Sequence, residues 1–312
     1  MIRPRAKGIS QSVQDRLKRE ALKRGRPFAE LLDLYAIERF LYRLGRSKHR
    51  ERFVLKGALL MRHWLGVDAR PTRDIDLLGP PDLDNDGVRA FLMDLLHLDV
   101  EDDGIEYEPD SLSVHPIREE SPVAGLRAKF NGYLGRVLLR YQVDVGLGDA
   151  VYPPADEIAP GGLLNLPVAT LRAYTPYTAV AEKLEAMVVL GEANSRMKDY
   201  YDLAALASAL DFDGPPLAES IRRSFRRRST QIPEGAPEGL SASFVEDPLS
   251  TGRWRAFIRK GKLTEASAEL SDVVARIRSF ALPALEAARD NLAFPKHWPP
   301  GGPWRARTRS RR

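Results

Sequence analysis

The strand patterns of this chain are confined to one stretch, residues 53–145, and helical patterns lie on both sides of it. Before the stretch, apolar residues of 12–48 recur at spacings of three and four, with a break near Gly25 and Pro27 that predicts two helices. Within it we expect strands at 53–55, 73–78, 107–114, 126–131 and 136–145, and helices at 58–65 and 88–96. The sequence therefore predicts a core that contains both strands and helices.

Helical periodicity dominates the second half. After a proline-rich connection at 153–167, apolar spacing predicts helices at 177–190, 196–209, 215–228, 249–260 and 264–287. We therefore divide the chain into N-terminal helices that pack on the core (1–50), the core itself (51–165), a helical C-terminal domain (166–290) and a basic, disordered tail (291–312).

Composition excludes several classes of protein. The 312 residues contain no cysteine, so disulfide frameworks, thiolate zinc sites and cysteine nucleophiles are excluded, and any metal must be bound by oxygen or histidine. No apolar run approaches the roughly 18 residues of a membrane span, and the N-terminus has no apolar signal core. We expect a cytoplasmic protein without a membrane partner.

The net charge of +5 comes from the C-terminus. Five arginines follow Trp304 without an acid, so residues 1–304 are neutral on balance. Such a tail can bind phosphate backbones by releasing counterions, or it can be a solubilising end, and the sequence leaves both open.

Familiar catalytic motifs are missing from the sequence. It contains no GxxxxGK[ST], GxSxG or HExxH, its five histidines lack ligand spacing, and Gly146-Leu147-Gly148 lacks the third glycine of a dinucleotide loop. P-loop, serine-hydrolase and zinc-peptidase chemistry therefore have no support.

An acidic pair is the first candidate site. Asp74 and Asp76 lie two apart on a predicted strand, so their side chains share one face, and Asp144 lies between two valines of another strand. Hard carboxylate oxygens suit Mg²⁺, which usually keeps waters and substrate phosphates as its other ligands. The pair thus predicts a magnesium site to which Asp144 adds a third carboxylate; the alternative is a solvated strand face.

A glycine turn precedes the acids. Lys56-Gly57-Ala58 ends a strand and opens a helix, about sixteen residues before the acidic pair. The glycine lets the backbone approach phosphates, and the first amides of the helix are free to bind an anion. An ordinary strand-to-helix turn is the other interpretation. Glycine turn, helix and acidic strand together are the arrangement of nucleotidyltransferases.

A second group of charges lies downstream. Lys183 is on a helix whose apolar residues face one way, and Arg196, Asp199 and Asp202 recur at i, i+3 and i+6 on the next helix. These side chains either line a nucleotide cleft or form a solvated lysine and an ordinary intrahelical ion pair.

From about residue 10 to residue 285 the chain resembles the AbiEii/AbiGii toxin family of nucleotidyltransferases, which includes MenT-type toxins. The resemblance rests on six segments: PFAELLDLYAIERFLYRL, FVLKGALLMRHWLG, RPTRDIDLLG, YQVDVGLGDAVYP, YTAVAEKLEAMVVLGEANSRMKDYYDL and RRSFRRRST. It implies an α+β fold, with a polymerase-β-like nucleotidyltransferase core (a mixed sheet with helices) and a helical second half. Such a protein acts as the toxin of a toxin–antitoxin or phage-defence pair.

The resemblance also implies roles for individual residues. The family often has serine, or a second glycine followed by threonine, after the motif glycine, and Ala58 offers neither, so triphosphate binding here depends on main-chain amides and lysine. The resemblance implies that Gly57 and Ala58 form the glycine motif, that Asp74 and Asp76 bind the metal, and that Lys183 and Asp199 are catalytic, with Thr72 near a position where some members have a hydroxyl residue. Together with the residues singled out above, the expected sets are catalytic (Asp74, Asp76, Lys183 and Asp199), nucleotide-binding (Lys56, Gly57, Ala58, Thr72 and Arg196) and Mg²⁺-binding (Asp74, Asp76 and Asp144).

The expected reaction transfers a nucleotide from an NTP to an acceptor and releases pyrophosphate. For MenT-type members the acceptor is the tRNA acceptor end, and a helix with Arg222, Arg223 and Arg226 to Arg228 suits RNA, although a basic solvated helix end explains it too. A separately encoded antitoxin is the implied partner. Two other functions stay open: a small-molecule nucleotidyltransferase of the antibiotic-modifying type, and an inert module that binds RNA or nucleotides.

Overall fold

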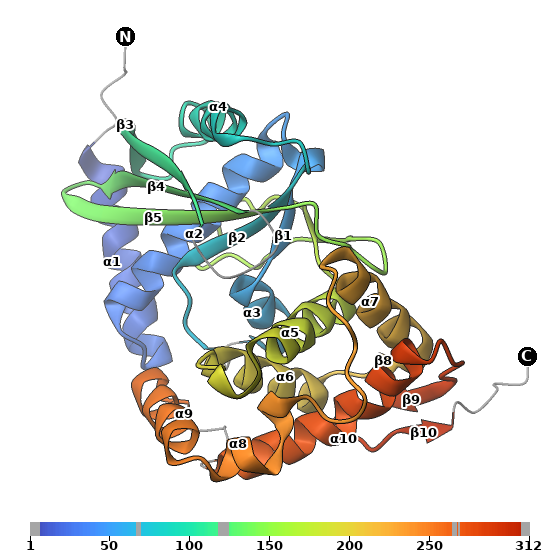
Figure 1. Cartoon of the computed structure of the whole chain (residues 1–312). Helices are drawn as coiled ribbons and strands as arrows, with labels where there is room; N and C mark the ends of the chain where they lie inside the picture. The colour runs from blue at the N-terminus through green and yellow to red at the C-terminus, as the bar shows by residue number, and fades with distance from the viewer. Residues whose placement is uncertain (1–6, 67–69, 118–124, 264–266, 268, 307–312) are drawn as a thin grey trace, which may run out of the picture. The chain divides into compact units, whose positions relative to one another are not determined.

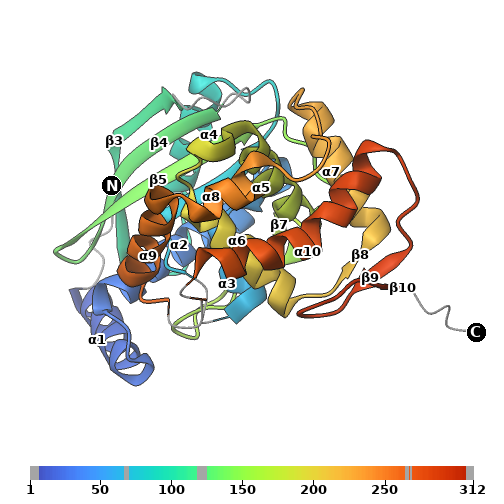
Figure 2. The same cartoon turned by 60° about the horizontal axis from the view of Figure 1, so that its bottom comes forward.

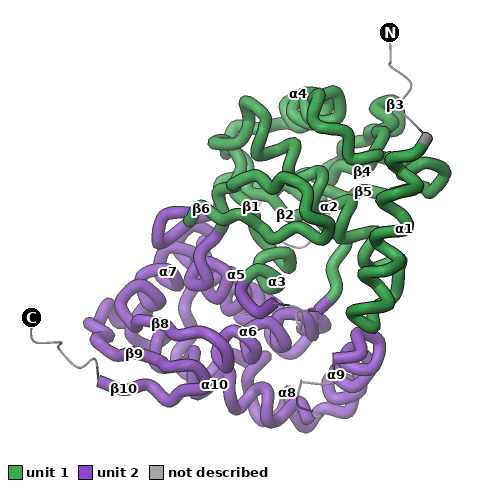
Figure 3. The backbone as a smooth tube through the Cα atoms, turned by 180° about the vertical axis from the view of Figure 1, so that it is seen from behind, with its two compact units in different colours: residues 1–63, 71–148, 156–173 green, residues 64–70, 149–155, 174–312 purple. Residues whose placement is uncertain are grey.

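The computed structural model describes residues 7–66, 70–117, 125–263, 267 and 269–306. The chain divides into two compact units (Figure 3). The first contains residues 1–63, 71–148 and 156–173, and the second contains 64–70, 149–155 and 174–312. The chain therefore passes between the units several times, and the N-terminal helices belong to the same unit as the sheet.

The first unit contains the strand-rich stretch and the helices before it (Figure 1). Its helical elements are α1 (Lys7–Arg24), α2 (Phe28–Arg46), η1 (Arg50–Arg52), α4 (Asn85–Leu96) and the beginning of α3 (Ala58–Leu65). Its strands are β1 (Val54–Lys56), β2 (Asp74–Gly79), β3 (Ile105–Pro116), β4 (Gly125–Leu134), β5 (Val137–Leu147), β6 (Asp156–Ile158) and β7 (Leu171–Ala173).

Within the described residues, these strands form a seven-stranded mixed sheet in the order β3-β4-β5-β2-β1-β7-β6. The pairs β2–β5 and β1–β7 are parallel, and the other neighbours are antiparallel. The predicted α+β class with a mixed sheet is confirmed. β2 lies at the centre of the sheet, between β1, which precedes it along the chain, and β5, which follows β3 and β4.

Alternation along the strands gives the sheet two different faces. Ile75 and Leu77 of β2 and Val143 and Val145 of β5 are fully buried on one face. On this side α2 packs its Phe40 ring 5.8 Å from the ring of β4 Phe130. Burial of these side chains stabilises the sheet by about 1.5–3 kcal/mol each. The intervening residues of β2 and β5 place their polar side chains on the opposite face.

The second unit is mostly helical (Figure 2). Its elements are α5 (Pro176–Leu190), η3 (Gly191–Ala193), α6 (Met197–Ala209), β8 (Phe212–Asp213), α7 (Gly214–Arg227), η4 (Glu238–Leu240), α8 (Ala242–Glu246), α9 (Pro248–Gly261), α10 (Leu270–Arg289), β9 (Lys296–Trp298) and β10 (Arg305–Ala306). The helices α5, α6, α7 and α10 pack on one another. Thr175 caps α5 by accepting a hydrogen bond from the Thr178 amide, and Asp247 caps α9 in the same way from Leu249 and Ser250.

Residues 291–306 are folded, which differs from the disordered tail expected from residue 291 onward. β9 pairs with β8 and β10, and Trp298 is 2% exposed, with its indole donating to the Ala207 carbonyl at 2.7 Å. Trp304 stacks on Phe280 of α10, with the ring centroids 5.9 Å apart. Burial of these large aromatic rings orders the segment. Residues 307–312, with four of the five tail arginines, lie outside the described residues.

No helix in the described part of the chain is both long and apolar enough to cross a membrane.

Candidate active site

A row of charged residues crosses the polar face of the first unit's sheet. Lys56 of β1 is opposite Asp76 of β2, Asp76 is opposite Asp144 of β5, and Asp144 is opposite Arg127 of β4. Residues that are opposite one another on neighbouring strands share a face. The prediction that Asp144 lies on a strand next to the acidic pair is therefore confirmed.

Gly57 and Asp76 are in close contact at the centre of this row. Gly57 has a φ of +76°, and a Cβ at this position would lie 2.6 Å from Cγ of Asp76, too close for any side chain. The Asp76 carboxylate therefore rests against the backbone of the turn that opens α3. The predicted glycine turn and the predicted acidic strand meet at this point.

Asp74, at the start of β2, is exposed, whereas Asp76 is partly buried. Thr72 lies just before the strand, with its hydroxyl 3.5 Å from the carbonyl oxygen of Asp74. Ala58, the first residue of α3, is buried and presents no polar group. All the candidate residues of 56–76 thus lie on two adjacent strands and the turn and loop next to them.

Asp144 is bound by an arginine that the sequence did not single out. Arg127 donates from Nε and Nη2 to the two carboxylate oxygens of Asp144, at 2.8 and 2.7 Å. A bidentate pair of this kind holds the carboxylate in one orientation. Among the described residues, no three His, Cys, Asp or Glu side chains are grouped closely enough to hold a metal.

The second unit contains the downstream candidates in a buried ionic network. Lys183 of α5 donates to Asp199 at 2.8 Å and to Asp202 at 2.7 Å, both on α6. These carboxylates are 2% and 0% exposed. Burial alone lowers the pKa of Lys183, but the two carboxylates outweigh it and hold the pKa above its usual value. Lys183 is therefore a charged, fixed ammonium group.

Two arginines complete the network. Arg70 binds Asp202 through Nε and Nη2 at 2.9 and 3.0 Å, and Nε of Arg196 lies 2.9 Å from Asp199. Although burial raises the pKa of Asp199, Lys183 and Arg196 lower it by more, so the carboxylate is ionised. Three cations face two carboxylates, and the network carries a net charge of +1. Arg70 was not predicted, because no spacing rule connects residues 132 positions apart.

The arginines of α7 are mostly paired within the unit. Arg222 and Arg223 both bind Glu219, and Arg228 donates to Glu185 at 2.8 Å and to Asp149 at 3.1 Å. In the expected RNA-binding cluster, only Arg226 and Arg227 are exposed. The cluster is a weaker electrostatic surface than its sequence indicates.

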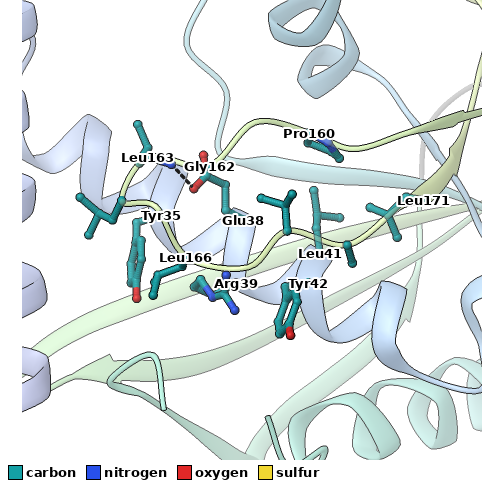
Figure 4. Close-up of a pocket in the computed structure, with 13 residues that line it drawn as sticks. Tyr35, Glu38, Arg39, Leu41, Tyr42, Pro160, Gly162, Leu163, Leu166 and Leu171 are labelled. Atoms are coloured by element: carbon teal, nitrogen blue, oxygen red, sulfur yellow. Dashed lines mark hydrogen bonds between the residues drawn. The ribbon is translucent and has the colours of Figure 1, made fainter. Parts of the chain in front are cut away.

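A small cavity in the first unit lies away from these residues, between α2 and the segment 160–171 (Figure 4). Its volume is about 20 Å³, enough for about one water and too small for a nucleotide. Glu38 points into it and accepts a hydrogen bond from the Leu163 amide at 2.9 Å. Burial raises the pKa of Glu38 to about 7.

The donor set on the polar sheet face suits a hard divalent cation. Mg²⁺ in nucleotide-dependent enzymes is commonly held by one or two carboxylates, with waters and substrate phosphates as the other ligands. Asp74 and Asp76 supply two carboxylates on one face, and Lys56 is the next residue in the row. Asp144 can take part only if its ion pair with Arg127 opens or is shared.

The mixed sheet, the glycine turn and the acidic pair define the class to which this protein belongs, the nucleotidyltransferases. The family model described as "Nucleotidyl transferase AbiEii toxin, Type IV TA system" matches residues 39–291. The chain belongs to this family of nucleotidyltransferase toxins. Membership implies a nucleotide substrate and an antitoxin partner.

Solved structures with similar folds include MenT4, a nucleotidyltransferase toxin from Mycobacterium tuberculosis. It is 19% identical, with 90% of this chain and 99% of that chain covered and a TM-score of 0.47. The protein JHP933 from Helicobacter pylori is 12% identical, with 85% of this chain and 93% of that chain covered and a TM-score of 0.46. No curated protein matches the chain.

Proposed function

We propose that this toxin is a Mg²⁺-dependent nucleotidyltransferase that transfers a nucleotide from an NTP to the acceptor end of tRNA. The observation that supports it most is the contact between Asp76 and Gly57, with Asp74 on the same strand face. A triphosphate cradled by the turn would then lie next to the two carboxylates. We further propose that the protein acts in the cytoplasm, where NTPs and tRNA are found.

Asp74 and Asp76 would hold the metal. When bound, Mg²⁺ supplies charge stabilisation for an in-line displacement at phosphorus. Lys56 and the free amides at the start of α3 would bind the phosphates, because Ala58 brings no hydroxyl. Thr72, in the loop before β2, would help to place the nucleotide.

In the proposed step, the acceptor hydroxyl oxygen bonds to the α-phosphorus while the bond from that phosphorus to the pyrophosphate oxygen breaks. The hydroxyl proton passes to Asp144 or to water, and pyrophosphate leaves. Arg127 would hold Asp144 in one orientation so that it can accept the proton or position the hydroxyl.

The second-unit candidates have supporting roles in this proposal. Lys183 would neutralise charge that develops on the pyrophosphate, and Asp199 would position Lys183. Arg196 would contact the nucleotide. The net charge of +1 on their network is compatible with an anionic substrate.

The test is incubation of the purified protein with each α-labelled NTP, Mg²⁺ and total tRNA. We expect label on RNA for at least one NTP, and none with Asp74→Asn/Asp76→Asn. Label on an aminoglycoside and not on RNA would indicate the antibiotic-modifying activity. NTP binding without label on either acceptor would contradict the proposal and favour an inert binding module.

A further inference from the structure

The helix α9 carries an outward face made of cations. Arg253, Arg255, Arg259, Lys260 and Lys262 are all exposed, and we name this set the α9 basic face. Residues 248–263 include no acid. Among the described residues, the ion pairs of this face amount to one contact, 3.4 Å between Arg255 and Glu269, whose side chains are 65% and 57% exposed. Such an exposed pair neutralises little of the charge.

The helix is firmly anchored on its inner side. Trp254 is 1% exposed and its indole donates to the Ser267 carbonyl at 3.1 Å, while Phe257 packs edge-on against Tyr201 of α6. Ser250 is fully buried one turn earlier. The cations therefore project from a fixed element beside α8 (Figure 2).

Helix stability does not explain the whole face. Cations in the last turn complement the helix dipole, which accounts for Arg259 and Lys260. Arg253 and Arg255 are in the middle of the helix, where the dipole has little effect. Between the cations on the outward side are Gly252 and Ala256, which are small enough to let a backbone come close.

The cations of α9 have fewer acidic partners than the arginines at the end of α7. There, Glu219 binds Arg222 and Arg223, and Glu185 and Asp149 bind Arg228, which follows the helix. On α9 the corresponding acids are absent from the helix itself. Five exposed cations on a rigid helix, with a single ion pair among the described residues, are suited to a polyanion whose charges are regularly spaced.

We infer that the α9 basic face binds the phosphate backbone of the RNA acceptor. The inference rests on the proposed function for the identity of the acceptor. The face contacts phosphates and not bases, so it contributes affinity and orientation without sequence preference. It lies outside every residue set that the sequence analysis predicted.

The experiment measures binding of total tRNA as a function of salt, with NTP absent. The variant Arg253→Gln/Arg255→Gln/Arg259→Gln/Lys260→Gln/Lys262→Gln is compared with wild type. The control removes five exposed cations elsewhere: Lys18→Gln/Arg19→Gln/Lys23→Gln/Arg46→Gln/Lys48→Gln. Each lost phosphate contact reduces the slope of log K against log salt by about 0.7–0.9. We expect the slope to fall by about 2–4 and affinity near 0.1 M salt to fall at least about tenfold, for the α9 variant only.

The outcomes separate this inference from the proposed function. Salt-dependent tRNA binding that requires the α9 face supports the inference even if no label is transferred. Equal loss in the control variant shows a general charge effect and overturns it. Unchanged tRNA binding by the α9 variant also overturns it, and loss of polyglutamate binding by that variant would then assign the face to an acidic protein partner.

Discussion

The β2 aspartates of the first unit and the α6 aspartates of the second have different surroundings. In the first unit, Asp74 is exposed and Asp76 rests against the backbone of Gly57. In the second, Asp199 and Asp202 are almost fully buried, and three cations surround them. A buried carboxylate costs several kcal/mol unless it is paired, whereas an exposed one keeps its hydration.

This difference in burial and pairing distinguishes residues expected to take part in the reaction from residues that stabilise the fold. The exposed carboxylate of Asp74 keeps its hydration, while the carboxylates of α6 are held by Lys183 and the two arginines. Changes at Asp74 and Asp76 should therefore affect the reaction and leave stability almost unchanged. Changes that leave the buried carboxylates of α6 without a cation should affect stability first.

The largest expected effect is on the reaction. Asp74→Asn/Asp76→Asn removes the charges that would hold the metal, and each lost interaction accounts for several kcal/mol in the transition state. We expect nucleotide transfer to fall at least about 10⁴-fold with an unchanged thermal midpoint. Transfer from labelled NTP and thermal unfolding of the same preparation are measured together, and a large drop in the midpoint would contradict the comparison.

The second prediction concerns stability. Lys183→Met leaves two buried carboxylates without their shared ammonium, which should lower the free energy of unfolding by about 3–5 kcal/mol. Urea unfolding measures it, and Lys198→Met, an exposed lysine one turn from Asp202, should change the value by less than about 0.5 kcal/mol. Adding Asp199→Asn and Asp202→Asn to Lys183→Met should recover part of the loss. If the free energy of unfolding did not recover, the unpaired charges of Asp199 and Asp202 would not be the cause of the loss.

Glu38 tests the rule that underlies the comparison, because its side chain is largely buried and its hydrogen bond comes from the Leu163 amide instead of a cation. Its pKa is raised from 4.5 to about 7 in the folded protein, so the folded state holds a proton that the unfolded state has lost. The contribution of this proton to the free energy of unfolding is complete below pH 4.5 and is lost as the pH rises through 7. The free energy of unfolding falls by up to about 3 kcal/mol over this range. Urea unfolding at pH 5 and pH 8 should show this loss in wild type and in Glu51→Gln, but not in Glu38→Gln.

Local features of the fold could be predicted from the sequence. Gly25 and Pro27 separate α1 from α2 as expected, since proline starts a helix more easily than it continues one. The alternation in RDIDLLG predicts both the strand and the face of its acids. The predicted position of Asp144 beside this strand is correct because apolar alternation also fixes which residues of β5 face the core.

Long-range partners could not be predicted. Arg127 meets Asp144 because β4 and β5 pair in one particular register, and the sequence does not reveal that register. Folding of residues 291–306 depends on Trp298 and Trp304 packing against α10, and these two tryptophans were the available signal against a disordered tail. Roles of Lys183 and Asp199 in the reaction stay predictions.

A smaller loss of nucleotide transfer is expected from Gly57→Ala. Both Gly57 and Gly66 have a φ of +76°, so alanine at either position costs about 1–2 kcal/mol of backbone strain. At Gly66 an added Cβ meets no neighbour within 4 Å, whereas at Gly57 it meets the Asp76 carboxylate. Transfer should therefore fall about tenfold or more only for Gly57→Ala, because displacement of a catalytic group by 1 Å is costly. Equal transfer activity in both variants would mean that the contact between Gly57 and Asp76 has no effect on the reaction.

The smallest effect on stability is expected at Arg196, where the two kinds of role can be separated. Its side chain is 42% exposed and pairs with Asp199 three residues away, so Arg196→Gln should change the free energy of unfolding by no more than about 0.5 kcal/mol. If Arg196 contacts the nucleotide, KM for the NTP rises at least about fivefold while kcat changes little, because a contact made equally in ground and transition states affects KM alone. Arg196→Lys keeps the charge and should restore most of the affinity. An unchanged KM would assign Arg196 to the ionic network alone.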